Sequence, residues 1–304
     1  MIGVTLRQLR YFCAVARQGH FGQAAAQCAI SQPALSQQIR ELESQLGALL
    51  VDRSGRRIAI TPAGREVAAR GEAILRAVED MEAAVRAAGQ SVSLRLGLIP
   101  TVAPYLLPRV LAMLAERGPE IELVPFEART SRLIEGLHDG RLDGAVMALP
   151  AGDGAFHAEP LFSEEFLLAR PLSAAGQPVP PAAALLDHGL LLLEEGHCLR
   201  DQALDYCGIA PRRDGQRIEG SALSTLVQMV AAGLGITLIP QMAVATESRA
   251  ARIDVIRLPA PRPGRQIGLV WRKSSPLAGQ LQELATAIRG LSDETVEAAA
   301  ATGR

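Results

Sequence analysis

From residue 93 onward, short apolar segments alternate with helical ones, and this alternation constrains the fold more than any other feature of the chain. The first set comprises Leu94–Ile99, Tyr105–Leu114, Ile121–Phe126, Arg132–Leu137 and Gly144–Leu149. The second begins near Leu167 and continues through Leu190–Leu193, Ala222–Ala232, Ile236–Ile239, Gln266–Trp271 and a final helix. Such alternation is typical of α/β domains on a parallel sheet. The pattern predicts two α/β subdomains joined by crossing strands, with a ligand cleft between them.

Length and composition indicate a soluble protein of more than one domain. The chain has 304 residues, of which 48% are hydrophobic and 21% charged, and no apolar run approaches the roughly 20 residues of a membrane span. Met1–Arg10 lacks the layout of a secretory signal, so we expect a cytoplasmic protein with no membrane contact. In that reducing compartment static disulfides are not expected for its cysteines, which are Cys13, Cys28, Cys198 and Cys207.

Charge is distributed unevenly along the chain. Residues 1–65 hold eight arginines against three acidic residues, a net charge of +5, whereas the whole chain carries −1. The N-terminal end therefore suits a polyanion such as DNA, and the remainder does not.

The basic end has the pattern of three short helices. Apolar residues at helical spacing predict the first helix: Leu6, Leu9, Phe12, Val15 and Ala16. A second follows at Gly22–Cys28, and a third begins at Ser31, a good N-cap, with Pro33 in its first turn. The buried stripe of the third helix is Leu35, Ile39, Leu42 and Leu46, and its polar face carries Gln32, Ser36, Gln37 and Arg40. Polar side chains early in a third helix are where a helix-turn-helix contacts DNA.

A hairpin pattern follows the third helix. Leu49–Asp52 and Ile58–Thr61 flank the basic turn Arg53–Arg57, which would act as a wing against the DNA backbone. The alternative is a small helical module with a solvated polar face. Cys13 and Cys28 are interpreted as small buried hydrophobes of this module.

Thr61 and Pro62 predict the start of a long helix that runs to Gly89. Its apolar residues form a narrow seam suited to pairing with another helix: Ile74, Val78, Met81 and Val85. The alternative is a helix packed on its own domain.

Hydroxyl side chains follow three of the predicted strands. These are Thr101, Thr130 with Ser131, and Ser221. Each could be only a helix cap, but together they favour a polar ligand cleft, since helix N-termini point N–H groups inward there.

The segment Gly196–Cys207 contains the most informative chemistry. Gly196-His197-Cys198 has the pattern of a loop that enters a helix, which places Cys198 at or near the helix N-terminus. The helix dipole, His197 and Arg200 would favour its thiolate, the form that attacks peroxide to give a sulfenic acid. Cys207 could capture that group as a disulfide. The alternative is two inert core cysteines.

The N-terminal region resembles the DNA-binding domain of the LysR-type transcriptional regulators. The resemblance rests on Ala24-Ala25, Ile30–Ser36, Ile39, Leu42-Glu43, Leu46-Gly47, Leu50, Arg53 and Thr61–Gly64. It implies a winged helix-turn-helix that binds as a dimer to paired half-sites. Contacts with DNA are then expected from Ser31, Gln32, Pro33, Ser36, Gln37 and Arg40, and from the wing residues Arg53 and Arg56.

The C-terminal region is similar to the peroxide-sensing members of that family. The similarity rests on Gly196–Ala203 with Cys207, on Leu98–Val102 with Pro104–Pro108, on Met229–Gly233 with Gly235–Leu238, and on Ile267–Val270. It implies that Cys198 reacts with hydrogen peroxide and that Cys207 resolves the product. Peroxide-binding or pocket roles are then expected for Thr101, Thr130, His197, Arg200, Asp201, Ser221 and Arg265. The sequence departs from this pattern at Phe126, where a relative has histidine, and at Arg212–Gly215.

The resemblance implies a domain plan. An all-α winged helix-turn-helix (1–61) and a long linker and dimerisation helix (62–90) precede a redox-sensing regulatory domain (91–291), and a tail (292–304) follows. The regulatory domain would have periplasmic-binding-protein-like (type II) α/β architecture. Its first subdomain would comprise about 91–163 and 268–291, and its second about 164–267.

The predicted function is a DNA-binding transcription regulator, activator or repressor, that senses hydrogen peroxide through a reversible Cys198–Cys207 disulfide and controls oxidative-stress defence genes. Expected partners are double-stranded promoter DNA, further copies of the chain as a homodimer or homotetramer, hydrogen peroxide, RNA polymerase and a thiol reductant of the glutaredoxin or thioredoxin type. No cofactor and no metal are expected.

Three other functions compete with this prediction. The first is a LysR-type regulator that binds a small organic effector in the cleft. The second is an enzyme, a thiol peroxidase or disulfide reductase, but the chain has no Cys-x-x-Cys motif and neither chemistry needs a DNA-binding domain. The third is a solute-binding protein, which would require export and is excluded more firmly.

Overall fold

The computed structural model describes residues 3–52, 58–87, 92–118, 121–151, 154–208 and 219–302, and these form two compact units, Met1–Val85 and Arg86–Arg304. The wing residues Arg53 and Arg56 and the segment Arg212–Gly215 lie outside the described residues. None of the helices in the described ranges is long and apolar enough to cross a bilayer.

The first unit contains the predicted helices and hairpin. Its helices are α1 (Leu6–Gln18), α2 (Phe21–Gln27), α3 (Gln32–Leu46) and α4 (Pro62–Ala87), and its antiparallel hairpin is β1 (Val51–Asp52) with β2 (Ala59–Ile60). Ser31 is the N-cap of α3, and its hydroxyl accepts a hydrogen bond from the Ala34 N–H at 3.4 Å. The predicted start of the third helix is therefore confirmed.

The core of this unit joins the three short helices to the hairpin. Phe12, Leu35, Ile39, Leu42 and Leu50 are fully buried. The predicted stripe is wrong at its last member, because Leu46 lies in the last turn of α3 and is 41% exposed. Cys13 is buried as predicted. Cys28 is only half-buried, because it is the C-cap residue that ends α2.

Helix α4 packs against its own unit near its start and becomes exposed further along. The Thr61 hydroxyl accepts a hydrogen bond from the Gly64 N–H at 2.9 Å, which confirms the predicted cap. Gly71 lies against the Cys13 sulfur, so the first half of α4 packs on its own unit. Further along, Ile74, Met81 and Val85 are 46%, 60% and 71% exposed. The alternative of a helix packed on its own domain therefore holds for the first half only.

The second unit begins with a parallel sheet. Strand β3 (Val92–Leu98) pairs in parallel with both β4 (Ile121–Glu127) and β5 (Gly144–Leu149). Helices α5 (Ala103–Arg117) and α6 (Thr130–His138) connect these strands. The alternating apolar residues of β3 are buried, as expected for a strand between two neighbours. This is the first predicted α/β subdomain.

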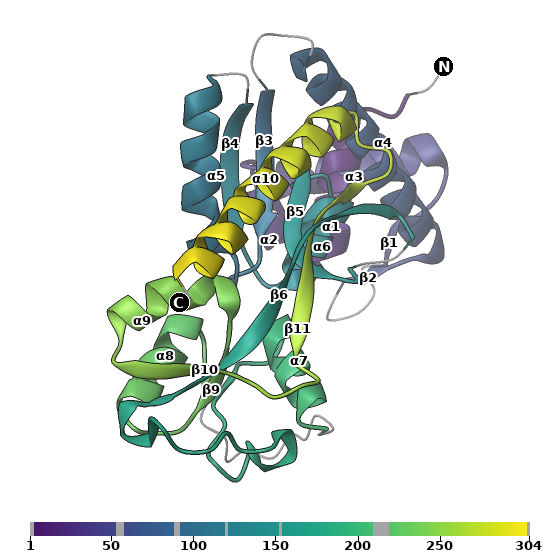
Figure 1. Cartoon of the computed structure of the whole chain (residues 1–304). Helices are drawn as coiled ribbons and strands as arrows, with labels where there is room; N and C mark the ends of the chain where they lie inside the picture. The colour runs from purple at the N-terminus through teal and green to yellow at the C-terminus, as the bar shows by residue number, and fades with distance from the viewer. Residues whose placement is uncertain are drawn as a thin grey trace. The chain divides into compact units, whose positions relative to one another are not determined.

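Two long strands run between this sheet and the second subdomain (Figure 1). They are β6 (Phe156–Pro171) and β11 (Gly264–Arg272), which pair antiparallel with each other. The far half of β6 also pairs antiparallel with β9 (Thr237–Pro240) and β10 (Ile253–Arg257). The predicted crossing strands are confirmed, but the prediction of a parallel sheet is wrong here. Strands β9, β10 and β11 all pair with the long strand β6, and each runs in the opposite direction to it.

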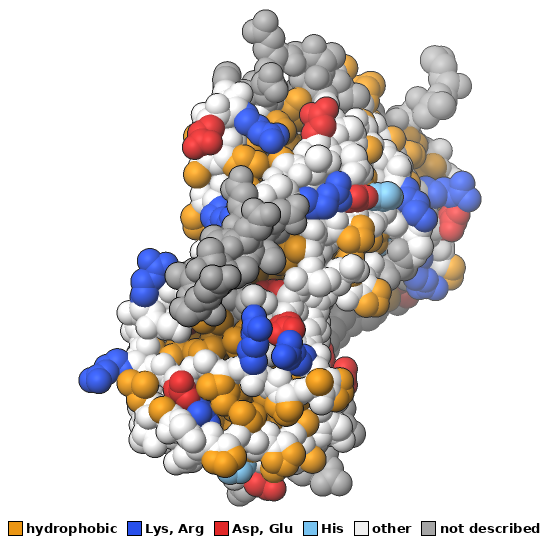
Figure 2. All heavy atoms as spheres, viewed as in Figure 1, with side chains coloured by type: hydrophobic (Ala, Val, Ile, Leu, Met, Phe, Trp, Pro, Cys, Tyr) orange, Lys and Arg blue, Asp and Glu red, His pale blue; other side chains and the backbone are white. Residues whose placement is uncertain are grey.

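The second subdomain is completed by short elements. Strands β7 (Leu192–Leu193) and β8 (Glu219–Gly220) pair in parallel. Its other elements are α7 (Cys198–Tyr206), α8 (Leu223–Ala231), α9 (Val244–Ala250) and the single turns η1 (Leu172–Ala174), η2 (Ala182–Ala184) and η3 (Gln241–Ala243). The final helix α10 (Ala278–Thr302) packs instead on the first subdomain, where Leu281 lies against Gly144 of β5. The second subdomain has its own apolar core. On the viewed face, hydrophobic side chains gather over this subdomain (Figure 2).

Candidate functional site

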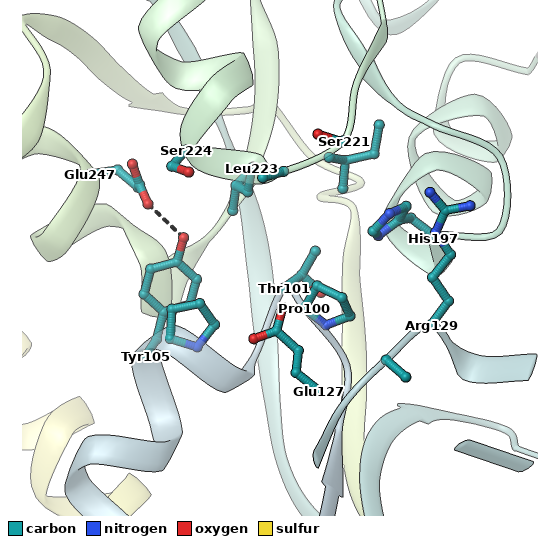
Figure 3. A pocket seen from close by; sticks show the side chains of 14 residues that line it. Pro100, Thr101, Tyr105, Glu127, Arg129, His197, Ser221, Leu223, Ser224 and Glu247 are labelled. Carbon is teal, nitrogen blue, oxygen red and sulfur yellow. Dashed lines mark hydrogen bonds between the residues drawn. The ribbon is translucent and has the colours of Figure 1, made fainter. Parts of the chain in front are cut away.

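A cavity of about 290 Å³ lies between the two subdomains of the second unit, Arg86–Arg304. The N-terminal ends of α5, α6 and α8 all border it. Its lining residues are Pro100, Thr101, Pro104, Tyr105, Glu127, Ala128, Arg129, Leu193, His197, Ser221, Ala222, Leu223, Ser224 and Glu247 (Figure 3). Three of the predicted pocket residues, Thr101, His197 and Ser221, therefore line the cavity. Thr130 is half-buried in the first turn of α6 and is not among the lining residues.

Thr101, Thr130 and Ser221 lie where strands lead into α5, α6 and α8, but they are not the N-cap residues of these helices. The N-cap residues of α5, α6 and α8 are Val102, Arg129 and Ala222, and none of the three makes a side-chain cap hydrogen bond. The alternative that Thr101, Thr130 and Ser221 serve only as caps is therefore wrong.

The predicted position of Cys198 is confirmed. Cys198 is the first residue of α7, and His197 is its N-cap. Burial raises the pKa of the Cys198 thiol above its ordinary value, and the charge and hydrogen bonding of Arg265 oppose this rise. Arg200, which we expected to favour the thiolate, instead donates to the Leu193 carbonyl at 2.8 Å and to Glu219 at 2.5 Å. The cation that faces the sulfur is therefore Arg265 rather than Arg200.

A buried ion pair fixes Arg265 beside Cys198. Arg265 and Glu164 are paired in register on β11 and β6, and their side chains are 0% and 5% exposed. The guanidinium donates from Nε to Glu164 at 2.8 Å and from Nη1 to the Thr101 hydroxyl oxygen at 2.7 Å. Glu164 also accepts from the Met242 N–H at 3.0 Å. Sequence analysis identified Arg265 and Thr101 but missed Glu164, whose partner lies 101 positions away.

His197 is a buried member of the site. His197 is 5% exposed, and its Nε2 atom has no hydrogen-bond partner within the described ranges. Burial lowers the pKa of His197, the charge of Arg129 lowers it further, and Glu194 acts in the opposite direction. The lowered pKa favours the uncharged imidazole, which reduces the support that His197 was expected to give the Cys198 thiolate. Asp201 lies in the first turn of α7 and is exposed.

Tyr105 and Glu247 were missed by sequence analysis. The Tyr105 hydroxyl, from α5, donates to the Glu247 carboxylate, from α9, at 2.6 Å across one end of the cavity (Figure 3). Burial and this hydrogen bond raise the pKa of Tyr105 far above its ordinary value. No local sequence signal identifies such a pair, because its members are 142 positions apart.

Cys207 ends the helix that Cys198 begins. It is the C-cap residue of α7 and packs in the core of the second subdomain at 5% exposure. Neither cysteine is in a disulfide. In the part of the chain that the structure describes, no group of three or more His, Cys, Asp or Glu side chains could hold a metal ion.

The polar face of α3 forms the second candidate site. Ser31, Gln32, Pro33, Gln37 and Arg40 are exposed. Ser36, the remaining predicted DNA contact on this helix, is half-buried. The exposed face carries the side-chain types that read base edges and phosphates.

Family comparisons match both units. Residues 6–65 match the lysR family of bacterial regulatory helix-turn-helix proteins, and residues 87–292 match the LysR substrate binding domain. The chain belongs to the LysR family. Two curated relatives resemble this LysR-family chain over nearly its whole length. One is a "Probable hydrogen peroxide-inducible genes activator" of Mycobacterium avium, 46% identical over 92% of each chain. The other is the "DNA-binding transcriptional dual regulator OxyR" of Escherichia coli K12, 42% identical over 95% of this chain and 96% of the relative.

Two solved structures of OxyR proteins are also similar to this chain over nearly its whole length. A Corynebacterium glutamicum OxyR cysteine variant with hydrogen peroxide bound is 37% identical, covers 98% of this chain and 96% of its own, and has a TM-score of 0.65. A full-length OxyR variant from Pseudomonas aeruginosa is 34% identical, covers 94% and 97% of the two chains, and has a TM-score of 0.69. The predicted fold class is confirmed by these matches.

Proposed function

We propose that this LysR-family chain is an OxyR-type regulator that senses hydrogen peroxide through Cys198 and Cys207 and controls oxidative-stress defence genes. The observation that carries the proposal is the placement of the two cysteines at opposite ends of α7, with Arg265 facing the Cys198 sulfur. The similarity to a "Probable hydrogen peroxide-inducible genes activator" and to the regulator OxyR supports it.

The first step is attack of the Cys198 thiolate on one peroxide oxygen. An S–O bond forms as the O–O bond breaks, and the departing hydroxide takes the proton that the thiol released and leaves as water. Cys198 becomes a sulfenic acid. The Thr101 hydroxyl oxygen accepts a hydrogen bond from Arg265, so its own proton can be donated to the bound peroxide. Thr130, His197, Asp201 and Ser221 complete the proposed surroundings, and Arg200 supports them by holding β7 and β8.

The second step forms the disulfide and reshapes the domain. The Cys207 sulfur attacks Cys198, and the sulfenic hydroxyl leaves with the Cys207 proton as a second water. Nine helical steps separate the cysteines by about 13 Å of rise, whereas a disulfide needs Cα atoms within about 7 Å. Helix α7 must therefore partly unwind, and this is the two-state element that we propose couples sulfur chemistry to DNA.

The proposal extends to domains and partners. We propose a DNA-binding domain at 1–61, a linker and dimerisation helix at 62–90, a regulatory domain at 91–291 and a tail at 292–304. The residues proposed to contact DNA are Ser31, Gln32, Pro33, Ser36, Gln37, Arg40, Arg53 and Arg56. The chain works as a dimer or tetramer on paired half-sites in the cytoplasm, acts on RNA polymerase, and is reset by two electrons from a glutaredoxin- or thioredoxin-type reductant. It is a regulator and not an enzyme.

The test is thiol chemistry on the full-length protein. Stoichiometric hydrogen peroxide should consume two thiols and yield a peptide pair that links Cys198 to Cys207 in mass spectrometry. Cys198→Ser should abolish this response, and Cys207→Ser should stop at a sulfenic acid. If DNA binding or transcription responds to peroxide without the linked pair, the proposed mechanism is wrong.

The cavity favours one alternative, a small organic effector. Its volume of about 290 Å³ lies near the lower end of the range for small-ligand sites. Under that alternative, a ligand should raise the melting temperature of the protein while both thiols remain titratable.

A further inference from the structure

Arg129 connects the two subdomains beside the reactive cysteine. It lies at the junction of β4 and α6 in the first subdomain, and its guanidinium reaches the loop of the second subdomain that precedes Cys198. Nη1 donates to the Glu195 carbonyl at 2.8 Å, and Nη2 donates to the Glu194 carboxylate at 2.5 Å. Two nitrogens of one planar group therefore hold two consecutive residues of the loop.

The position of Arg129 is unusual for its residue type. It is the N-cap residue of α6, where Ser, Thr, Asp or Asn normally accepts a hydrogen bond from the first turn. An arginine side chain has no acceptor and makes no cap bond here. The long Arg129 side chain instead extends across the cleft to Glu194 and Glu195.

The loop is shaped to receive this side chain. Gly196 has φ of +92°, a conformation that favours glycine, and a Cβ there would lie 3.3 Å from Arg129 Cδ. The arginine stem thus packs over the bare Gly196 backbone. Figure 3 shows the guanidinium beside the His197 ring at one end of the cavity. The contacts of Arg129 cover Glu194, Glu195 and Gly196, and the next two residues are His197 and Cys198.

We propose that Arg129 is a positioning residue for the peroxide reaction, and that it clamps the loop Glu194–His197 across the inter-subdomain cleft. The clamp fixes the start of α7 and thereby keeps the Cys198 sulfur against Arg265. The inference rests on the proposed function. It adds the requirement that the two subdomains be closed on each other for the reaction, since Arg129 and the Cys198 sulfur belong to different subdomains.

A clamp can be distinguished from a purely electrostatic effect, because its two partners carry opposite charges. If Arg129 acted only through its field, removing it would slow peroxide attack by disfavouring the thiolate, and removing Glu194 would accelerate attack. If the two residues act as a clamp, either truncation loosens the loop and slows the reaction. The two models therefore predict opposite signs for Glu194→Ala.

The experiment measures the second-order rate constant for oxidation of Cys198 by hydrogen peroxide in full-length protein. Arg129→Ala should lower it about fivefold, the scale of a well-formed, partly exposed ion pair. Glu194→Ala should lower it less, because the bond to the Glu195 carbonyl remains. The rate constant of Arg129→Lys should lie between those of Arg129→Ala and the wild type. An ammonium group keeps the positive charge but lacks the two nitrogens of the guanidinium that donate side by side. In NMR titration the His197 pKa should rise in Arg129→Ala and fall in Glu194→Ala, since the two charges shift it in opposite directions.

The matched control is Arg132→Gln, one turn along α6, whose partner Glu135 lies on the same helix and whose side chain is 71% exposed. It should leave the rate constant unchanged. Faster oxidation in Glu194→Ala, unchanged rates in both truncations, or an equal loss in the control would each overturn the clamp. Wild-type protein that does not react with peroxide would instead refute the proposed function, so the two failures are distinguishable.

Discussion

At the scale of single residues, the reactivity of Cys198 is set by two opposing effects. Burial raises the pKa of its thiol, and Arg265 opposes this by charge and hydrogen bonding. Glu164 in turn holds Arg265 in a fully buried ion pair, so part of the arginine charge is already compensated. At neutral pH the thiol form therefore predominates, and peroxide attack draws on a small thiolate fraction.

This balance predicts a pH dependence. Because the raised pKa lies above the neutral range, the thiolate fraction and the oxidation rate constant should rise about tenfold per unit between roughly pH 6 and pH 8. Replacing the pair together, as Arg265→Gln with Glu164→Gln, avoids an unpaired buried charge and should lower the rate about tenfold at each pH while the slope persists. Stopped-flow kinetics across this range checks both expectations. A flat profile in the wild type would show that the reactive sulfur is already ionised.

Local patterns placed some of the site residues, and the family resemblance added others, such as Arg265. Cys198 follows a Gly-His pair at a helix start, and Thr101 follows a strand, so both positions were predicted. Glu164 and Tyr105 act through partners more than 100 positions away along the chain. Their roles depend on strand register and subdomain packing, which no local pattern encodes.

At the scale of elements, caps and apolar periodicity were sufficient to predict the helices of the first unit. Ser31 and Thr61 begin α3 and α4 as predicted. Strand β10 and helix α9 were not predicted, and the strand directions around β6 were wrong. A short strand such as Ile253–Arg257 takes its direction from the long strand it joins rather than from its own residues.

Helix α4 supplies an element-scale prediction. Its seam leaves Met81 and Val85 60% and 71% exposed and Val78 half-buried within their own unit, an arrangement typical of a helix that pairs with another copy. Val78→Glu with Met81→Glu places charge on that seam and should convert dimers to monomers in analytical ultracentrifugation. The regulatory unit should keep its circular dichroism spectrum and its peroxide-reactive thiol. Glu82→Gln, at an exposed neighbouring position, is the matched control and should leave the dimer intact. A double variant that remains dimeric at low concentration would assign the main interface to another surface.

At the scale of the whole molecule, the chain joins a basic DNA-binding unit to an acidic sensing unit. The net charge of +5 on residues 1–65, within a chain of −1, confines attraction for DNA to one end. On the viewed face of the regulatory unit, acidic and basic side chains are interspersed rather than gathered into a field of one sign (Figure 2). Binding strength should therefore depend on the few cations at the DNA-binding unit.

Arg40 is the described cation on the exposed face of α3, and Arg53 and Arg56 are the predicted cations of the wing. Each phosphate contact releases counterions on binding, so replacing any one arginine with alanine should weaken binding and reduce the salt slope by about one. Fluorescence anisotropy with promoter DNA over a series of salt concentrations measures both quantities. Arg252→Ala, in the sensing unit, is the control and should leave affinity and slope unchanged. Unaltered affinity and slope in all three DNA-binding variants would contradict the docking of α3 and the wing on DNA.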